Sequence, residues 1–522
     1  KYKKNYVEKL YEERTEPGNP FTYLKFAANF PESPYKMEAL NEVYLIKKKN
    51  GTLDEYVDFV KSYPDNPNVE KAWRRIYALE VKEVTPKSIA KFTLQYPEYP
   101  FMNELRSDFD LATTRYYPVE ENGKWGFINE DGQLAIIPEY NWVENFSDGM
   151  AMVGMEEGVT FIDKSGHRIS DAAYDDAYPF ASGYAVVEIN GNLGIINRLG
   201  EWVADPEYGD LGEFSEGKFY AERNGRYGYL DEDGEVALPF LFDDANDFQT
   251  GVAVVDSSGL RGLIDSTGML IAHFDYDWIE GFADHETPSR FRINDRFGLM
   301  LNSGEIVTDT LYEMMSPFSE GFVLAAMNEK YGFMNAIGDT AIAFTYDFSD
   351  RALEESYFQN GYAKVFQKDK VGVIDTTGKK VFPAIFEDVG TFMGELIPIK
   401  KRGEWGYADL KVDLAIPYQF DYADNFRDSV AIVSKNGRFG LIDTLGKPRI
   451  ALNYASMAWV DTVLLASDSA YGLLNISGDT LVPLQFEEAV VVDDHIIRFQ
   501  TKSGEIHYYD YRRQEFLRRE EN

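Results

Sequence analysis

The chain has 522 residues, a net charge of −36 and no cysteine. The missing cysteine excludes disulfides, thiol nucleophiles and cysteine-ligated metals. The acid excess begins after residue 115: residues 1–115 carry 19 Lys and Arg against 18 Asp and Glu, and the remainder carries 33 against 70. Such an acidic body repels nucleic acid and anionic membranes, and no run approaches the roughly 20 apolar residues of a membrane-spanning helix. We therefore predict no nucleic-acid partner, no transmembrane segment in this chain, and a domain boundary at residues 115/116.

Residues 20–115 repeat with a period of 33, because FTYLKFAANFPESP, DEYVDFVKSYPDNP and KSIAKFTLQYPEYP align without gaps. Apolar residues three apart, such as Tyr56 and Phe59, predict the buried face of a helix. The first proline of each pair is expected to end that helix. The second is expected in the first turn of the next helix. Residues 1–115 are therefore predicted to form three helical hairpins of tetratricopeptide-repeat length.

Capping residues support these helix boundaries. Ser33 and Asn66 stand just before the second proline and are predicted N-caps. Thr52 with Glu55 predicts a capping box. The basic run at 47–49 is expected at a helix end, where cations complement the dipole. Arg74 and Arg75 are expected on a solvated helix face.

The segment NFPESPYKMEA at 29–39 resembles the short-loop tetratricopeptide repeats of envelope lipoproteins that help to assemble outer-membrane proteins. The resemblance implies a location in the bacterial cell envelope, in the periplasm or at the surface, and a membrane-associated complex as partner. It also implies a lipid anchor on a cysteine ahead of Lys1. The small packing residues of that family are matched clearly only at Ala39 and Ala72, so an irregular superhelix is expected.

From residue 116 the period changes to 34 residues, counted from Gly126. Ten further positions share its register: Thr160, Gly194, Gly228, Gly262, Gly298, Gly332, Gly372, Gly406, Gly440 and Gly472. Asn or Asp follows three residues later except at Leu301, and Gly follows six residues later except at Val412. An aromatic residue follows fourteen residues later in every unit.

Each recurring feature predicts local structure. The alternation in WGFIN predicts a strand, and Asn/Asp-x-x-Gly predicts a turn that the side chain caps while Gly takes positive φ. Stretches such as LAIIP and MAMVG predict two further strands, the last pairing with the next unit's first. Each unit is therefore a predicted antiparallel meander of three or four strands. Glycine inside a strand indicates a close approach, which we expect between neighbouring sheets, and the in-register aromatics are expected in the core.

KWGFI and its relatives resemble the WG repeat of bacterial proteins, although the Trp-Gly pair itself stands only at 125–126 and 405–406. The resemblance covers residues 116–486, and EIHYYDYRRQEF at 505–516 is expected to be a degenerate capping unit. It implies an all-β array over residues 116–522 and no defined activity. Blade-like sheets that close into a propeller and sheets that stack as an open superhelix both fit the sequence.

Length varies only between each aromatic residue and the next unit's origin. The loops 282–291 and 347–361 are therefore candidate contact points, since insertions in a repeat array lie on one face. The alternative is that both are tolerated surface insertions.

No catalytic, cofactor-binding or metal-binding residue is predicted. The five histidines form no recognisable pair and are expected to be solvated or packed; they are His167, His273, His285, His495 and His507. No phosphate-binding glycine loop or nucleophile elbow is present. The acidic runs 231–235 and 243–247 lack the spacing of a calcium loop.

These observations predict a non-enzymatic protein–protein interaction scaffold in which an all-α module precedes an all-β array. The alternative is a surface protein that binds glycan or peptidoglycan, motivated by the 15% aromatic content. Burial of Trp142, Trp202, Trp278 and Trp459 would weaken that alternative, because a sugar platform needs exposed rings.

Overall fold

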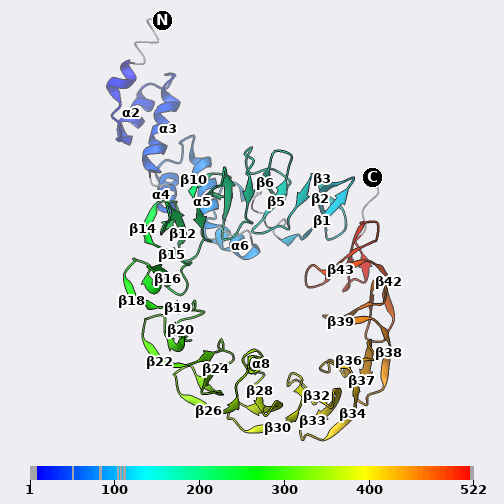
Figure 1. The fold of residues 1–522 in the computed structure, drawn as a ribbon. Coiled ribbons are helices and arrows are strands. Elements are labelled where there is room, and N and C mark those ends of the chain that lie inside the picture. The colour runs from blue at the N-terminus through cyan, green and yellow to red at the C-terminus, as the bar shows by residue number, and fades with distance from the viewer. Residues whose placement is uncertain are drawn as a thin grey trace. The chain divides into compact units, whose positions relative to one another are not determined.

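The computed structural model describes residues 9–49, 52–81, 85–102, 105, 109 and 113–517. The chain divides into two compact units, residues 1–240 with 519–522, and residues 241–518. Helices give way to strands at Tyr116 (Figure 1). None of the helices in the described part is long and apolar enough to cross a membrane.

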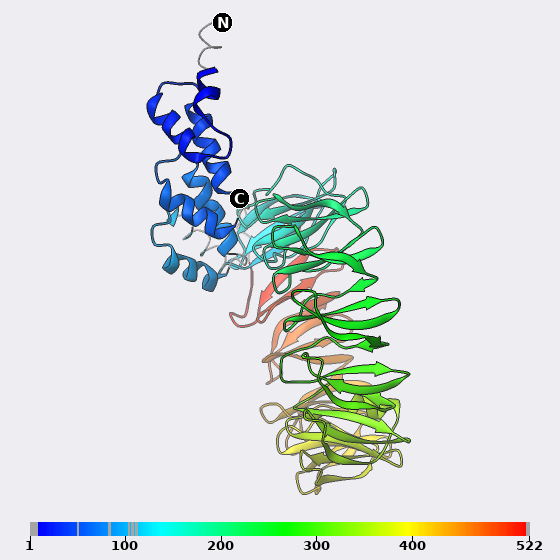
Figure 2. The ribbon, with the colours of Figure 1, turned by 90° about the vertical axis from the view of Figure 1, so that its left-hand side faces the viewer.

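The helices of the first two predicted hairpins pair as the 33-residue period predicts, and Figure 2 shows the amino-terminal helices stacked along the module. They are α2 (Pro20–Asn29), α3 (Lys36–Lys47), α4 (Leu53–Ser62), α5 (Val69–Glu80) and α6 (Pro86–Gln95). The second helix of the third predicted hairpin falls mostly outside the described residues. The predicted aromatic positions form one core, in which Phe26, Phe59 and Phe92 are almost fully buried. The helices α2, α4 and α6 each end two residues before the first proline of a pair, as predicted.

The start of the second helix in each hairpin differs from the prediction. Pro34 and Pro67 lie in turns, and α3 and α5 begin only at Lys36 and Val69. Ser33 and Asn66 therefore cap these turns, accepting hydrogen bonds from the amides of Tyr35 (3.2 Å) and Asn68 (2.9 Å). Thr52 caps α4 by accepting from the Glu55 amide at 3.4 Å, which is the Thr52 half of the predicted capping box.

Twelve small antiparallel sheets follow along the described chain, ten with four strands and two with three. In a four-stranded sheet we name the strands first to fourth in chain order, which is also their order in space. The first strand usually has two residues, and the third carries the repeated glycine. This meander is the sheet from which β-propellers are built.

Up to the division between the units, the sheets are β1 (Tyr116–Glu121), β2 (Lys124–Asn129) and β3 (Leu134–Tyr140); β4 (Trp142–Val143), β5 (Met150–Gly154) and β6 (Val159–Asp163); β7 (Asp176–Ala177), β8 (Tyr184–Ile189), β9 (Asn192–Asn197) and β10 (Trp202–Tyr208); and β11 (Asp210–Leu211), β12 (Lys218–Arg223), β13 (Arg226–Asp231) and β14 (Val236–Phe242).

The second unit continues with β15 (Asp244–Ala245), β16 (Val252–Ser257), β17 (Leu260–Asp265) and β18 (Leu270–Tyr276); β19 (Trp278–Ile279), β20 (Ser289–Ile293), β21 (Arg296–Met300) and β22 (Ile306–Tyr312); β23 (Met314–Met315), β24 (Phe322–Met327), β25 (Lys330–Asn335) and β26 (Thr340–Asp347); and β27 (Phe358–Gln359), β28 (Tyr362–Gln367), β29 (Lys370–Asp375) and β30 (Lys380–Phe386). Its last four sheets are β31 (Asp388–Val389), β32 (Leu396–Lys401), β33 (Glu404–Asp409) and β34 (Leu414–Phe420); β35 (Tyr422–Ala423), β36 (Val430–Lys435), β37 (Arg438–Asp443) and β38 (Pro448–Tyr454); β39 (Ser456–Val460), β40 (Val463–Ser467), β41 (Tyr471–Leu474) and β42 (Thr480–Phe486); and β43 (Glu488–Val491), β44 (Ile496–Gln500), β45 (Ile506–Asp510) and β46 (Glu515–Phe516).

The repeated glycine marks a close approach, as the sequence predicts. The expectation that a neighbouring sheet makes this approach is wrong, because the approaching backbone belongs to the same sheet. Trp125 faces Tyr140 and Phe127 faces Ile136, so three residues of β3 stand opposite Gly126 alone. A Cβ atom on Gly126 would lie 2.3 Å from the Ile136 carbonyl oxygen. In all ten units that carry the glycine, such a Cβ would lie within 3.0 Å of a carbonyl oxygen of the last strand of the sheet. The glycine is therefore required by the bulge of that last strand.

Thr160 is the one residue among the eleven repeat origins that replaces the glycine, and the structure of its sheet accounts for the replacement. Thr160 lies in the sheet of β4, β5 and β6, which has no fourth strand. Only two isolated bridges form there, and the Thr160 hydroxyl donates to the Ala172 carbonyl at 3.2 Å. A side chain is tolerated because no bulged strand closes over the position.

The predicted turn chemistry is confirmed. In the first sheet, Asn129 Oδ1 accepts from the amides of Asp131 and Gln133, and Gly132 has φ 76°. The acidic run 231–235 is such a turn, with Asp231 accepting from Asp233 and Glu235. Val412, which replaces the turn glycine, still takes positive φ.

The aromatic residues fourteen positions after each origin lie in the core, as predicted. Eight of the eleven are buried, and Phe242, Tyr276 and Tyr454 are half-buried. Burial, helped by the neighbouring charge of Glu139, raises the pKa of Tyr140 to about 12. The Tyr140 ring therefore stays neutral around pH 7 and acts as a packing group.

Candidate functional site

The two length variations predicted as contact points differ in structure. In the loop 282–291, Asp284 Oδ1 accepts from the amides of Glu286 and Thr287, which makes a compact turn. Asn302 holds the loop through a 2.7 Å hydrogen bond to His285 Nδ1. The loop 347–361 instead folds into a helix, α8 (Asp350–Glu355), and the strand β27. Figure 1 shows α8 beside β28, on the side away from β30.

The helix α8 takes the place of the usual first strand of its sheet. In the next sheet, Asp388 and Val389 of β31 pair with Lys400 and Ile399. In the sheet of α8, the short strand β27 pairs instead near the start of β28, Phe358 facing Ala363. The far end of β28 therefore lacks a first-strand partner, and its backbone groups need another one.

Tyr331 supplies that partner. Its side chain is fully buried, and its hydroxyl accepts from the Phe366 amide at 3.0 Å. The same hydroxyl shares a 2.9 Å hydrogen bond with Ser356, directly after α8. Burial raises the pKa of the Tyr331 hydroxyl, although both hydrogen bonds oppose the shift. The Tyr331 hydroxyl thus accepts the hydrogen bond that the Phe366 amide would otherwise donate to a first strand. Through Ser356 it also holds the end of α8 against the sheet.

A four-member ion-pair network joins α8 to two sheets. Lys364 Nζ lies 3.1 Å from both Glu355 Oε2 and Asp388 Oδ1. Arg351 contacts the same two carboxylates, at 2.7 Å and 3.0 Å. Burial alone would raise the pKa of the Glu355 carboxyl, but the Arg351 hydrogen bond and Lys364 hold it below its ordinary value. Two acidic side chains are therefore matched by two basic ones in one network.

A half-open cavity of about 290 Å³ lies between the insertion and the next sheet. We call it the α8 pocket. Its polar lining comes from Glu354, Glu355, Tyr357, Gln359, Tyr362, Lys364, Asp388 and Thr391, and its apolar and backbone lining from Ala363, Val373, Gly390 and Phe392. Of these residues, the sequence singled out only those within 347–361.

Lys364 was missed, although the sequence holds a signal for it. It occupies the second-strand position just before the residue that faces the repeated glycine. That position is apolar or aromatic in nine units, namely at Pro118, Met152, Val186, Tyr220, Val254, Leu324, Pro398, Ile432 and Leu465. A cation stands there only at Arg290, Lys364 and Arg498, and each pairs with an acid. A basic residue at a repeat position that is otherwise apolar therefore indicates an ion pair with a nearby acid.

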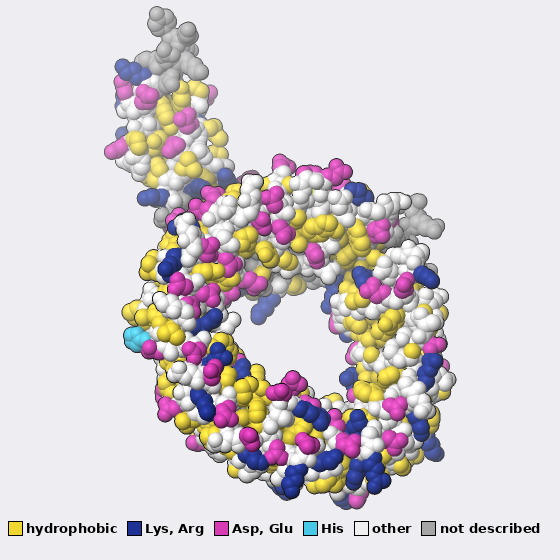
Figure 3. Space-filling view, in the orientation of Figure 1, with side chains coloured by type: hydrophobic (Ala, Val, Ile, Leu, Met, Phe, Trp, Pro, Cys, Tyr) yellow, Lys and Arg dark blue, Asp and Glu magenta, His cyan; other side chains and the backbone are white. Residues whose placement is uncertain are grey.

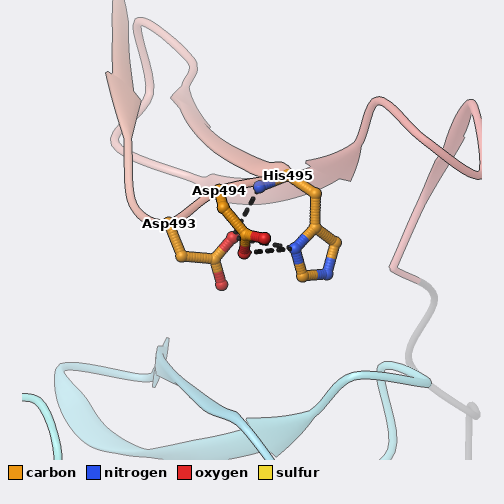
Figure 4. Close-up of side chains that lie close together, drawn as sticks. All are labelled: Asp493, Asp494 and His495. Atoms are coloured by element: carbon orange, nitrogen blue, oxygen red, sulfur yellow. Dashed lines mark hydrogen bonds and ion pairs between the residues drawn. The ribbon is translucent and has the colours of Figure 1, made fainter. Parts of the chain in front are cut away.

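The acids and histidine at 493–495 form a second cluster, in the last sheet (Figure 4). His495 Nδ1 lies 2.9 Å from Asp494 Oδ1 and 3.2 Å from Asp493 Oδ1. These ligand atoms lie within 4.8 Å of one another, which is compatible with a cation. However, Arg512 contacts Asp494 at 3.0 Å, and the His495 amide donates to Asp493. The cluster is therefore accounted for as an internal network that closes the end of the array.

The other histidines behave as predicted. His167, His273 and His285 are exposed. His507 is packed, because it takes the place of the repeated glycine in the capping unit, facing Phe499. Its ring lies 5.7 Å from that of Phe486 and 6.0 Å from that of Phe516. The bulk is accepted because β46 has only two residues and does not close over it.

The four tryptophans are not all buried. Trp142 is 38% exposed and Trp202 is 40% exposed, whereas Trp278 and Trp459 are half-buried. Arginines lie over the last two rings, Arg290 and Arg427 each at 5.5 Å from the centroid. Only the first two rings therefore keep substantial exposure.

The expectation that Arg75 lies on a solvated helix face is wrong. Arg75 forms an ion pair with Glu201 of the third sheet, within the first unit. Arg198 of the same sheet donates to the Val81 carbonyl, just after α5, at 2.7 Å. Arg74 is exposed but stacks over the Phe101 ring at 4.0 Å. The helical module therefore contacts the array through charged groups.

The fold and its repeated motif define a blade-like β-repeat protein with an amino-terminal helical module. The model of the WG containing repeat matches residues 125–157, 160–192, 194–227, 227–259, 262–286, 297–331, 372–405 and 405–439. The chain belongs to this WG-repeat family. The structure places the same sheet in segments the model leaves out, at residues 332–371 and after 439.

Solved structures show only a distant likeness. A eukaryotic initiation factor is 11% identical, with 64% of this chain and 94% of that chain covered and a TM-score of 0.27. BamB from Moraxella catarrhalis is 12% identical, with 58% and 96% covered and a TM-score of 0.22. The extracellular domain of a hybrid two component system from B. thetaiotaomicron is 10% identical, with 77% and 66% covered and a TM-score of 0.22. No curated protein matches the sequence.

Proposed function

We propose that this protein is a non-enzymatic protein–protein interaction scaffold in an assembly of the bacterial cell envelope. The observation that carries the proposal is a set of exposed apolar residues at one repeated structural position. Six strands that end their sheets begin with such a residue: Leu134, Trp202, Val236, Leu270, Ile306 and Leu414. We call these six residues the entry row.

The recurrence is what distinguishes the entry row from ordinary surface. Single exposed apolar residues are normal on soluble proteins. Here each member is 40–49% exposed and begins the edge strand of its sheet. An apolar side chain kept exposed at the same site in several sheets supports contact with another macromolecule.

The charge distribution supports a protein partner. Figure 3 shows acidic and basic side chains interspersed over the visible face, with apolar side chains between them. Such a surface offers a protein partner apolar contacts together with the polar groups that form the rim of an interface. The resemblance of residues 29–39 to envelope lipoprotein repeats supports the location.

The proposal includes the absence of catalysis. The most prominent carboxylates serve structural roles: turn caps such as Asp231, ion pairs such as Glu355 with Arg351, and the network at 493–495. A glycan-binding surface protein has narrower support, namely the exposure of Trp142 and Trp202.

Affinity purification of the full-length protein from native membranes tests the proposal. We expect specific partners with the wild type, and a loss of about tenfold or more with the double variant Leu270→Glu, Ile306→Glu, since two apolar contacts are removed. Thr340→Glu is the matched control, because Thr340 begins β26 at the same structural position. Recovery of the wild type alone from the cytosol, or partners that the double variant retains, would contradict the proposal.

A further inference from the structure

The α8 pocket is a feature of one repeat and not of the array. The interval after Tyr346 is six residues longer than the usual twenty, and these residues build α8 and displace the first strand. Buried hydrogen bonds from Tyr331 hold this arrangement. A tolerated insertion needs no such anchoring, so the pocket is a built structure.

The charges of the pocket favour a neutral ligand. Glu355 and Asp388 are each paired with both Lys364 and Arg351. The formal charges of these four side chains therefore cancel. Lys364 disfavours a cationic ligand, and the carboxylates disfavour an anionic one. Glu354 lies at the exposed rim.

Four polar side chains around the pocket are uncommitted. Within the part of the chain that the structure describes, no hydrogen bond joins the side chains of Tyr357, Gln359, Tyr362 or Thr391 to the protein. Three hydroxyls and one amide offer both donors and acceptors. They match a ligand that carries several hydroxyl groups.

Aromatic rings supply the apolar part of the lining. Tyr362 and Phe392 lie with their centroids 4.6 Å apart, and Tyr357 is 45% exposed beside them. A sugar ring presents an apolar C–H face together with hydroxyl edges, which suits such a mixed surface. The volume is at the lower end of the roughly 300–1,000 Å³ typical of ligand pockets, so it suits one small unit.

We propose that the α8 pocket binds a single neutral sugar residue, free or at the end of a glycan. The uncommitted side chains hydrogen-bond its hydroxyls, and the aromatic side chains contact its apolar face. The inference goes beyond the scaffold proposal and does not depend on it, because the pocket and the entry row share no residue.

Saturation-transfer NMR with the full chain tests the inference. The probes are glucose, galactose, mannose, N-acetylglucosamine and N-acetylgalactosamine, with inorganic phosphate and arginine amide as charged comparisons. We expect at least one neutral sugar to bind, with affinity reduced about tenfold in Tyr357→Ala and in Gln359→Ala, which corresponds to about 1.4 kcal/mol. Both side chains are exposed, so the fold should tolerate these variants.

Tyr178→Ala is the matched control, because Tyr178 is an exposed tyrosine that does not line the pocket. Its sugar binding should equal that of the wild type. The inference is overturned if none of the five sugars binds, if Tyr357→Ala and Gln359→Ala bind as well as the wild type, or if phosphate or arginine amide occupies the pocket in preference to every sugar. Free sugar and glycan ends are distinguished by comparing reducing monosaccharides with their methyl glycosides.

Discussion

At the residue scale, the absence of one methyl group decides whether a bulged strand can close on its neighbour. Wherever the repeated glycine is present, the bulged last strand of the sheet closes on it, and where Thr160 stands no such strand forms. The Trp-Gly pair that names the family is therefore a packing motif. Its glycine accommodates backbone, while the residue before it varies from Trp125 to Arg261.

We predict that Gly332→Ala destabilises the protein more than Gly321→Ala. A Cβ on Gly332 would lie 2.3 Å from the Ile342 carbonyl oxygen, so strands must separate. We expect a loss of about 3 kcal/mol, in the range of severe core substitutions. Gly321 meets nothing within 4 Å and has φ 78°. Alanine there should cost about 1–2 kcal/mol, the cost of a left-handed residue. Urea unfolding measures both, and equal losses would refute the bulge explanation.

The turn caps give a pH prediction. Hydrogen bonds to Asp265, first from the Thr267 hydroxyl and then from the Met269 amide, hold its pKa below the ordinary 3.8. A depressed folded-state pKa contributes stability above the unfolded pKa, and this contribution is lost as the pH falls through the folded value. Asp265→Asn keeps the acceptor without titrating. The wild type should therefore lose more stability than Asp265→Asn below about pH 4, measured by unfolding at several pH values. Parallel curves would contradict this cause.

At the scale of elements, edge strands need protection from pairing with other chains. The last strand of each sheet is an edge strand, and six of these strands contain a proline near the bulge: Pro138, Pro206, Pro239, Pro383, Pro417 and Pro483. Proline lacks the amide that a pairing strand would use. In β3, β10, β14 and β34, the bulge and the proline therefore leave the entry-row side chain available while discouraging backbone pairing, and in β18 and β22 the bulge alone does so.

We predict that Tyr331→Phe loosens α8. Loss of the hydroxyl leaves the Phe366 amide without its buried acceptor, at a cost of about 1–3 kcal/mol. Hydrogen exchange should show faster exchange at α8 and at Phe366. Tyr407→Phe is a matched control, since it also removes a buried hydroxyl, one that donates to the Asp424 carbonyl at 2.7 Å. It should destabilise its own sheet and leave α8 protected. Unchanged protection of α8 in Tyr331→Phe would show that other contacts hold the helix.

Much of the element order could be predicted, because period, turn chemistry and proline positions are local signals. The strand around Gly126, the turn at Asn129 and the core position of Tyr140 were all predicted correctly. The partner of Gly126 was assigned wrongly, because a bulge arises from pairing and leaves no trace in one strand's sequence. Pro34 was placed inside a helix because proline favours a turn and a first helical turn alike.

The candidate site was predicted only as a longer loop. Its extra length was visible, but the hydrogen bond of Tyr331 to Ser356 joins residues 25 positions apart and follows from the displaced strand. Asp388 belongs to the next sheet and carried no unusual pattern. Lys364 alone had a signal, as a basic residue at an otherwise apolar repeat position.

At the scale of the whole molecule, the helical module and the array meet within the first unit through charges. Arg75 and Glu201 form the ion pair, with side chains 23% and 51% exposed. A double-mutant cycle with Arg75→Ala and Glu201→Ala should give a coupling energy below about 1 kcal/mol, because solvent screens partly exposed pairs. A coupling above about 2 kcal/mol would show that the contact is desolvated and central to the joint.

The 34-residue sequence repeat and the sheet are offset from each other. Strands two and three of a sheet meet at the start of a sequence repeat, as where β12 meets β13, so each repeat completes one sheet and begins the next. An excision or duplication of 34 residues, wherever its ends fall within regular repeats, rejoins chemically equivalent positions and leaves no half-built sheet. The array can thus change its number of sheets in single genetic steps. A segment such as the α8 insertion cannot be regenerated in this way, and its loss would be permanent.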